Sequence, residues 1–395
     1  MSCCNKTEKG IVDISKIFKP KMAQTTGCGS GSLPRIASFL LRPIADFCNL
    51  DCSYCYYKTH KKTVSWDSDL TIKIMYDIIR YVKETQYSVK LCWHGGEPML
   101  AGLDFYKEAV YSTNIFIQKY DIPKHRIQHT IQTNATLINQ KWCDFFKENN
   151  FGVGISFDII KDVQNKERSN SYKKIIKAIE LLQNNNISFG INTVCSEALL
   201  LHNPEDIFNQ IVHLKLKNLE FSQMSQKDRD NEKYNQMYAK FMIGMIDVYL
   251  QYNNKDISFR FFDSAIKELL AKQGSLCTHN KKHCGNYPTI DAYGNFHFCD
   301  NYDEKEYLVK DVASLKKISL IEAVQIESYQ QIRENPRLYS DDCDTCDVSD
   351  LCQGGCPGNF DHKLKHNIFC SAYKQIFRHI KNTVGETVNY LKENG

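Results

Sequence analysis

The residues best suited to chemistry are three closely spaced cysteines, Cys48, Cys52 and Cys55. They lie in a C-x3-C-x2-C segment, residues 47–57, which we call the cysteine loop. Three thiolates on one short loop can bind three irons of a 4Fe–4S cube and leave the fourth iron without a protein ligand. An iron with an open position is a place for chemistry. A zinc site that lacks its fourth ligand, or three packed cysteines, is the alternative interpretation.

A second group of eight cysteines lies in the C-terminal part of the chain. These are Cys277, Cys284, Cys299, Cys343, Cys346, Cys352, Cys356 and Cys370. Eight thiolates are enough for two fully ligated cubes, or for two sites of the zinc-ribbon type. Spacing alone does not pair them, because many divisions into two sets of four are possible.

The cysteine content also indicates a compartment. The chain has 17 cysteines in 395 residues, and in a reducing cytosol such a content favours metal binding over disulfides. Residues Met1–Lys9 contain no apolar segment of the signal-peptide type, and no stretch is apolar enough for a membrane helix. We therefore expect a cytoplasmic protein without a membrane partner.

Composition excludes other classes of partner. Fifty Lys and Arg against 46 Asp and Glu leave a net charge of +4, and there are no long basic runs. Electrostatic binding to nucleic acid is therefore not expected. A hydrophobic content of 42% is ordinary for a globular protein and argues against a disordered chain.

Apolar runs and amphipathic stretches alternate up to about residue 225. The runs predict strands at Ser38–Ile44, Val89–Trp93, Ile127–Thr133, Val153–Phe157, Phe189–Val194 and Leu219–Met224. The stretches predict helices, among them Leu70–Thr85, Phe105–Lys119, Tyr172–Gln183 and Pro204–Leu214. This α/β pattern indicates a parallel sheet or partial barrel, with reactive groups at the carboxyl ends of the strands.

The cysteine loop, placed after the first strand and with Tyr54 before its last cysteine, resembles the signature of the radical S-adenosylmethionine (SAM) superfamily. The resemblance implies a partial (β/α)6 barrel in which the open iron binds SAM. It also implies reductive cleavage of SAM to a 5′-deoxyadenosyl radical, with an electron from an external reductant such as flavodoxin or ferredoxin.

Other strand ends resemble SAM-binding positions of that family. Gly95-Gly96-Glu97 is similar to its GGE loop, in which Glu97 would accept a hydrogen bond from the SAM amine. Asn134, Ser156 and Arg168 match further SAM-contacting positions. A plain βα turn and ordinary helix caps are the alternatives.

The C-terminal cysteines resemble the SPASM domain of peptide-modifying radical SAM enzymes. That resemblance implies one auxiliary 4Fe–4S cluster on Cys277, Cys284, Cys299 and Cys356. It implies a second auxiliary cluster on Cys343, Cys346, Cys352 and Cys370. Electron transfer or structural support would be their role. Together with the barrel, this predicts a flexible extension at 1–36, a radical SAM domain at 37–255, and a SPASM domain with a C-terminal helix at 256–395.

Within this group the chain is most similar to anaerobic sulfatase-maturating enzymes, which oxidise Cys or Ser of a sulfatase to formylglycine. The matching segments are 95–102, 132–137 and Cys299-Asp300. The resemblance implies that Asp300 is the base that takes a proton from the substrate, and that Tyr57 is an active-site tyrosine. A solvated turn aspartate and a core aromatic are the alternatives.

Two departures concern the substrate. His94 stands where sulfatase-maturating enzymes commonly have Gln, and His before GGE resembles enzymes that mature ribosomally made peptides (RiPPs). Ile159-Ile160 replaces a Gly-Pro pair. On these grounds the sequence favours a RiPP-type peptide maturase that cross-links or oxidises its substrate, with formylglycine formation as the alternative. A non-catalytic iron–sulfur or zinc protein is the remote third hypothesis.

Overall fold

A computed structural model describes residues 33–57, 64–224, 232–252, 256–301, 313–334 and 340–394. The predicted flexible extension at 1–36 lies almost entirely outside these ranges. Within the part described, Leu33 to the C-terminus groups as one compact unit.

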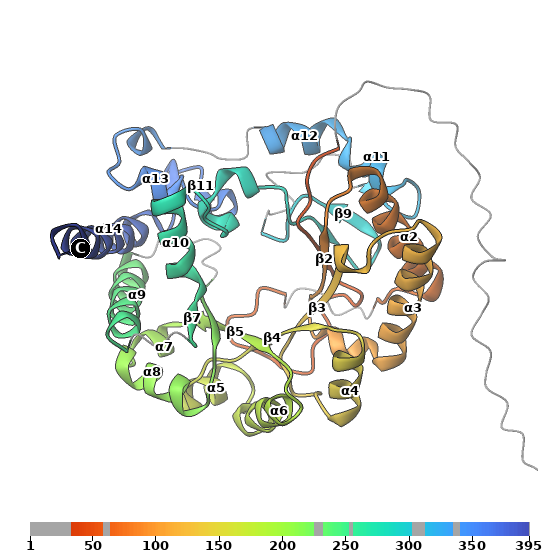
Figure 1. Ribbon diagram of the computed structural model, residues 1–395, viewed down its shortest axis with the longest axis horizontal. Helices are drawn as coiled ribbons and strands as arrows, with labels where there is room; N and C mark the ends of the chain where they lie inside the picture. The colour runs from red at the N-terminus through yellow and green to blue at the C-terminus, as the bar shows by residue number, and fades with distance from the viewer. Residues whose placement is uncertain are drawn as a thin grey trace, which may run out of the picture. The chain divides into compact units, whose positions relative to one another are not determined.

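Seven parallel strands pair in chain order and form the framework of the molecule (Figure 1). They are β1 (Ser38–Leu41), β2 (Val89–Trp93), β3 (Ile127–Thr133), β4 (Gly152–Ser156), β5 (Phe189–Cys195), β6 (Asn218–Gln223) and β7 (Ser258–Phe259). The sheet curves, and helices cover its outer face. The predicted α/β fold and its six parallel strands are confirmed.

Helices connect successive strands. They include α2 (Ser68–Thr85), α3 (Leu103–Lys119), α4 (Gln140–Glu148), α5 (Lys161–Glu167), α6 (Tyr172–Asn184), α7 (Glu197–Leu200), α8 (Pro204–His213) and α9 (Glu232–Tyr252). Their buried residues recur at helical spacing, as Ile74, Met75 and Ile78 do in α2. Asp67 caps the N-terminus of α2, because its side chain accepts a hydrogen bond from Leu70 N. None of the described helices is both long and apolar enough to cross a membrane.

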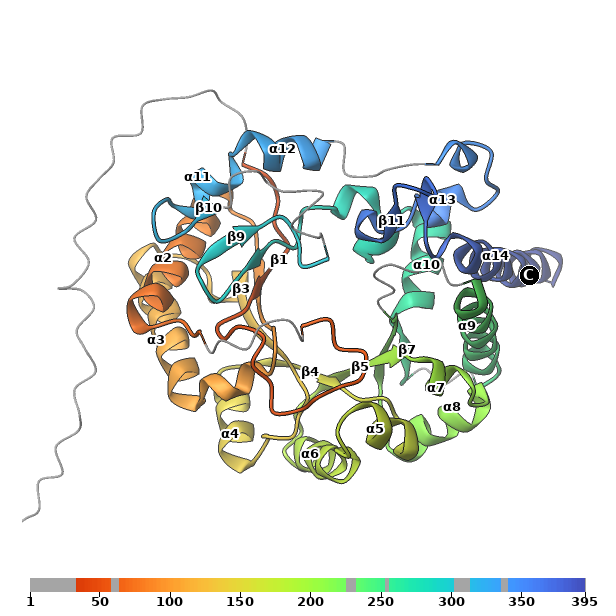
Figure 2. The same cartoon turned by 180° about the vertical axis from the view of Figure 1, so that it is seen from behind.

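The C-terminal part extends the same sheet. Strand β8 (Thr289–Ile290) pairs in parallel with β1, and β9 (Asn295–His297) and β10 (Ala313–Ser314) continue the sheet in antiparallel order. Figure 2 shows β9 and β10 on the β1 side of the sheet, although they are distant from β1 in sequence. The sheet thus reaches across residue 255, and the division into domains at that residue stays a prediction.

Short helices complete the C-terminal part. They are α10 (Arg260–Ala271), α11 (Leu320–Val324), α12 (Glu327–Glu334) and α13 (Ser349–Cys352), followed by the long α14 (Cys370–Asn394). The last of these corresponds to the C-terminal helix expected from the sequence.

The two faces of the sheet differ in polarity. Apolar side chains such as Phe39, Leu91 and Ile155 are buried beneath the helices. On the other face Gln132 and Asn192 are only partly covered. Because side chains alternate along a strand, the apolar set holds the helices while the polar set lines the inside of the curved sheet.

Tyr81 provides a test of how the first described segment of the chain, which begins at Leu33, is anchored. Its hydroxyl donates to Pro34 O and accepts from Ile36 N at 2.9 Å, in a fully buried position. Tyr81→Phe leaves both backbone groups without this partner and should lower the free energy of unfolding by about 1–3 kcal/mol. Urea unfolding measures the loss. Tyr111→Phe, at a ring that is 39% exposed, is the matched control and should be neutral; equal effects would contradict the anchoring role.

Candidate active site and cluster sites

The cysteine loop follows β1 and is held by backbone contacts on two sides. On one side Glu97 N donates to Phe47 O at 2.9 Å. On the other side Ser53 N donates to Glu167 O at 2.9 Å, and Asp51 N donates to Ser169 Oγ at 2.8 Å. The loop is therefore clamped between the GGE loop and the end of α5.

Gly95 and Gly96 allow this close approach. Gly95 has φ +107°, in the region that favours glycine. A Cβ on Gly96 would lie 2.1 Å from Phe47 O. Only glycine therefore fits between the two loops at this position.

Glu97 organises the GGE loop from inside. Its carboxylate is fully buried and accepts hydrogen bonds from Met99 N at 3.0 Å, Thr133 Oγ1 at 2.7 Å and Asn134 N at 2.7 Å. Burial raises the pKa of Glu97 to about 7, although the three hydrogen bonds act to lower it. Glu97 thus ties the end of β2 to the end of β3, and its contact with the SAM amine stays a prediction.

Asn134 lies next to the first cysteine. Its Nδ2 donates to Asn49 Oδ1 at 2.8 Å and lies 3.7 Å from Cys48 Sγ, while Leu50 N lies 3.4 Å from the same sulfur. Amide donors around a thiolate favour its charged form. The structure therefore places this predicted SAM-binding residue against the cysteine loop.

The three thiols of the loop are near enough to influence each other. Burial raises the pKa of Cys52 to about 11; Arg168 opposes this, while Cys55 and Cys48 add to it. Deprotonation of these buried thiols is unfavourable in the metal-free protein. It becomes favourable when the irons of a cluster bind the sulfurs, because metal binding stabilises the thiolate. In the described part of the chain no three His, Cys, Asp or Glu side chains converge on a single metal ion. A cube differs from such a site, because each thiolate binds its own iron, and the three cysteines fit it.

Arg168 braces the loop through a buried ion pair that sequence reasoning did not foresee. Its Nε lies 3.0 Å from Asp158 Oδ2, and its guanidinium lies 5.1 Å from the centre of the Tyr54 ring. The Tyr54 hydroxyl donates to the same carboxylate. Ser156, two residues before this aspartate at the end of β4, accepts from Gln132 Nε2 at 3.0 Å. Arg168 and Ser156 thus line the carboxyl ends of the strands, and their contacts with SAM stay predictions.

The three predicted catalytic residues come together from three parts of the chain. The Tyr57 hydroxyl donates to Asp300 Oδ2 and lies 3.4 Å from His94 Nδ1. Burial and the nearby Asp300 raise the pKa of Tyr57, so this phenol stays protonated and can donate. Burial lowers the pKa of His94, which favours the neutral imidazole.

Two residues of this cluster were missed in the sequence. Arg42 Nη1 lies 3.5 Å from Asp300 Oδ1, and its guanidinium sits 4.5 Å from the centre of the Tyr57 ring. The Tyr56 hydroxyl donates to Asp300 Oδ2 at 3.2 Å. A cation inside the apolar run predicted as the first strand was the available signal for Arg42, and adjacency to Tyr57 was the signal for Tyr56.

The first set of C-terminal cysteines lies beside Asp300. Asn301 Nδ2 lies 3.2 Å from Cys356 Sγ, and Asn301 N lies 3.4 Å from Cys299 Sγ. Burial raises the pKa of Cys299, and Cys356 and Cys277 raise it further. These three thiols therefore form a group, while Cys284 follows the short helix Lys281–His283.

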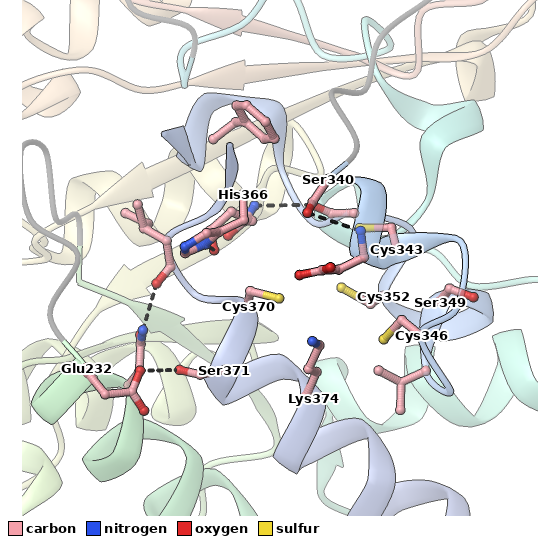
Figure 3. A pocket seen from close by; sticks show the side chains of 17 residues that line it. Glu232, Ser340, Cys343, Cys346, Ser349, Cys352, His366, Cys370, Ser371 and Lys374 are labelled. Atoms are coloured by element: carbon pink, nitrogen blue, oxygen red, sulfur yellow. Dashed lines mark hydrogen bonds between the residues drawn. The ribbon is translucent and has the colours of Figure 1, made fainter. Parts of the chain in front are cut away.

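The second set lines a single cavity of about 320 Å³, which we call the tail cavity (Figure 3). Its four thiols are Cys343, Cys346, Cys352 and Cys370. Burial raises the pKa of Cys352 to about 12, and the other three thiols contribute in the same direction. Four thiols that surround one cavity and disfavour one another's ionisation are a donor set that fits a 4Fe–4S cube. Cys356 and Cys277 thus neighbour Cys299, whereas Cys343, Cys346 and Cys370 neighbour Cys352, and the assignment of two sets of four to two auxiliary clusters stays a prediction.

Comparisons with known proteins identify similar chains and a similar fold. Residues 43–213 match the family model of the Radical SAM superfamily. A cysteine-type anaerobic sulfatase-maturating enzyme of Clostridium novyi is 27% identical over 86% of this chain and 94% of its own length. A serine-type enzyme of Bacteroides thetaiotaomicron is 25% identical over 86% and 88%. The solved structure of native anSMEcpe with bound AdoMet and a peptide has a TM-score of 0.78 at 23% identity, covering 91% of this chain and 100% of that one. This comparison shows that the two proteins share a fold.

The matched segment, the parallel sheet and the three-cysteine loop define the class: the chain contains a radical SAM domain. Within that class, the curated relatives named above, which match most of its length, are named anaerobic sulfatase-maturating enzymes. The resemblance to radical SAM enzymes and the resemblance to anaerobic sulfatase-maturating enzymes, both expected from the sequence, are confirmed.

Gly96→Ala tests the close approach of the two loops. The added Cβ must displace Phe47 O, because the two atoms would lie 2.1 Å apart. A shift of about 1 Å at a reacting site can cost about 100-fold in rate, so we expect a loss of that size in SAM cleavage, measured as 5′-deoxyadenosine. Gly190→Ala is the control, since its nearest neighbour would be 3.8 Å away. Unchanged cleavage in Gly96→Ala would refute the contact.

Arg168→Met tests the buried ion pair. It leaves the fully buried Asp158 carboxylate without its cation, which should lower the free energy of unfolding by about 3–5 kcal/mol. Arg80→Met is the control: it removes a surface pair with Glu84, at 3.7 Å, and should cost about 1 kcal/mol or less. Anaerobic urea unfolding compares them. Equal losses would mean that Arg168 has no special structural role.

Proposed function

We propose that this protein oxidises a Cys or Ser side chain of a peptide or protein substrate to formylglycine. The observation that carries the proposal is the Asp300 cluster beside the cysteine loop, in a chain that aligns over most of its length with sulfatase-maturating enzymes. The sequence favours RiPP maturation through His94, whereas the comparisons support formylglycine formation better. The assignment of the protein as a radical SAM enzyme does not depend on whether the product is formylglycine or a modified RiPP.

Several groups would hold the cofactors. Cys48, Cys52 and Cys55 would bind the SAM-binding cube, and the two C-terminal sets of cysteines would bind the auxiliary cubes. When bound, SAM and its cube supply the carbon-centred radical that removes a hydrogen atom from the substrate. An external reductant and a cytoplasmic location are part of the proposal.

Asp300 is the proposed base. Oδ2 accepts hydrogen bonds from both tyrosines, and Oδ1 faces Arg42 at 3.5 Å. A carboxylate has about four lone-pair positions, so an oxygen held in this way can still accept a proton from a substrate thiol or hydroxyl. The surrounding donors fix the orientation of the carboxylate.

Tyr57 and His94 support this arrangement. Tyr57 keeps its proton and donates to Asp300, while a neutral His94 faces the Tyr57 oxygen through Nδ1. The imidazole can therefore fix the orientation of the phenol without adding positive charge beside the base.

RiPP maturation remains the second candidate because of one position near the strand ends. Ile159 is fully buried and has φ +61°, a rare conformation for a β-branched residue. A glycine would adopt this conformation without strain, so the isoleucine is a departure next to Asp158 that favours a different substrate.

Asp300→Asn is the decisive variant. Reconstituted protein would be incubated with SAM, reductant and a peptide bearing a sulfatase-type Cys or Ser. We expect the rate of aldehyde formation, measured by mass spectrometry of the peptide, to fall by about 100-fold or more, because general-base catalysis contributes that much. 5′-Deoxyadenosine should still form.

Asp104→Asn, at an exposed aspartate on α3, is the control and should retain full activity. Wild-type protein that makes 5′-deoxyadenosine but no aldehyde would refute formylglycine formation and favour RiPP maturation. Protein that cleaves no SAM would favour the non-catalytic hypothesis.

A further inference from the structure

We propose that Lys374 is the cation that balances the anionic cluster in the tail cavity and raises that cluster's reduction potential. The inference rests on the tail cluster of the proposed function, and it is independent of the substrate.

The position of Lys374 is the first argument. It lies one helical turn after Cys370 on α14 and lines the same cavity as the four cysteines. In Figure 3 its nitrogen points toward the four sulfurs. Among the described residues that line the cavity, it is the only lysine or arginine; Asp342 and Glu232 are the acidic ones.

The pairing of its neighbours is the second argument. Three other basic side chains on α14 have acidic partners: Arg378 with Asp347 at 2.7 Å, His379 with Asp247 at 2.6 Å and Lys381 with Asp350 at 2.7 Å. Within the described parts of the chain, no ion pair of this kind joins Lys374 to a carboxylate. Lys374 thus differs from these neighbours: it lines the cavity with the four cysteines and takes part in no such ion pair among the described residues.

Lys374 interacts electrostatically with two of the cavity's cysteines, Cys343 and Cys370. A cluster held by these sulfurs would experience the same attraction.

Reduction adds one negative charge to a centre that four thiolates already surround. A nearby ammonium group favours the more negative state, and cluster potentials depend on net charge and on hydrogen bonds to the sulfurs. Lys374 should therefore favour the reduced cluster, against the opposing effect of Asp342 and Glu232.

The test is a redox titration of the reconstituted full chain, followed by electron paramagnetic resonance, without peptide. Lys374→Gln should lower the ratio of reduced to oxidised tail cluster about tenfold at a fixed potential, equal to about 59 mV for one electron. The other transitions should not move. Cys352→Ala identifies the tail cluster, because its transition should disappear.

Lys381→Gln is the matched control: it removes the same charge from the same helix, where the lysine is paired with Asp350. Lys374→Arg should keep the wild-type potential. An unchanged potential in Lys374→Gln, an equal shift in Lys381→Gln, or the lack of any cluster on the four tail cysteines would overturn the proposal.

If Lys374→Gln fails to assemble the cluster, iron content decides. Retention in Lys374→Arg together with loss in Lys374→Met would support a requirement for the charge. Loss in the arginine variant as well would overturn it. Because no readout involves a substrate, a failed formylglycine assay leaves this test intact.

Discussion

The site depends on the close approach of two backbone segments, Phe47 in the cysteine loop and Gly96 in the GGE loop. Glu97 N donates to Phe47 O at 2.9 Å, and no side chain fits between the segments. Because the buried Glu97 carboxylate also binds the end of β3, three consecutive strand ends are joined around the cysteines. A loop that must present three thiolates in a fixed arrangement gains its rigidity from these neighbours rather than from its own sequence.

A second constraint brings the C-terminal part to the same place. Strand β8 pairs with β1, and Arg42 N, directly after β1, donates to Ile290 O at 2.9 Å. The β8–β9 hairpin then leads to Cys299 and Asp300. One hydrogen-bonded ladder therefore positions both Arg42 and the carboxylate that it faces, so that the base beside the cysteine loop depends on contacts between segments far apart in the chain.

A strained residue and a buried ion pair lie side by side after strand β4. Ile159 adopts a left-handed backbone conformation while fully buried, next to an Asp158 whose N–H donates to Gln164 Oε1 at 2.8 Å. Such a conformation persists only where the surroundings determine it, and it occurs often at functional sites. The Asp158–Arg168 pair beside it brings a buried carboxylate and a buried guanidinium within 3.0 Å of each other at the strand ends.

The sequence by itself determined the class of chemistry and the framework. Cysteine spacing is local information, and periodicity places the strands: Val89–Trp93 and Ile127–Thr133 were predicted to the residue. What only the tertiary structure decided is which distant groups meet. The Asp158–Arg168 pair, the contacts of Arg42 and Tyr56 with Asp300, and the position of Lys374 in the tail cavity arise from strand pairing and helix packing. Such contacts leave no periodic pattern, because they join single residues from separate elements and depend on the three-dimensional path of the chain.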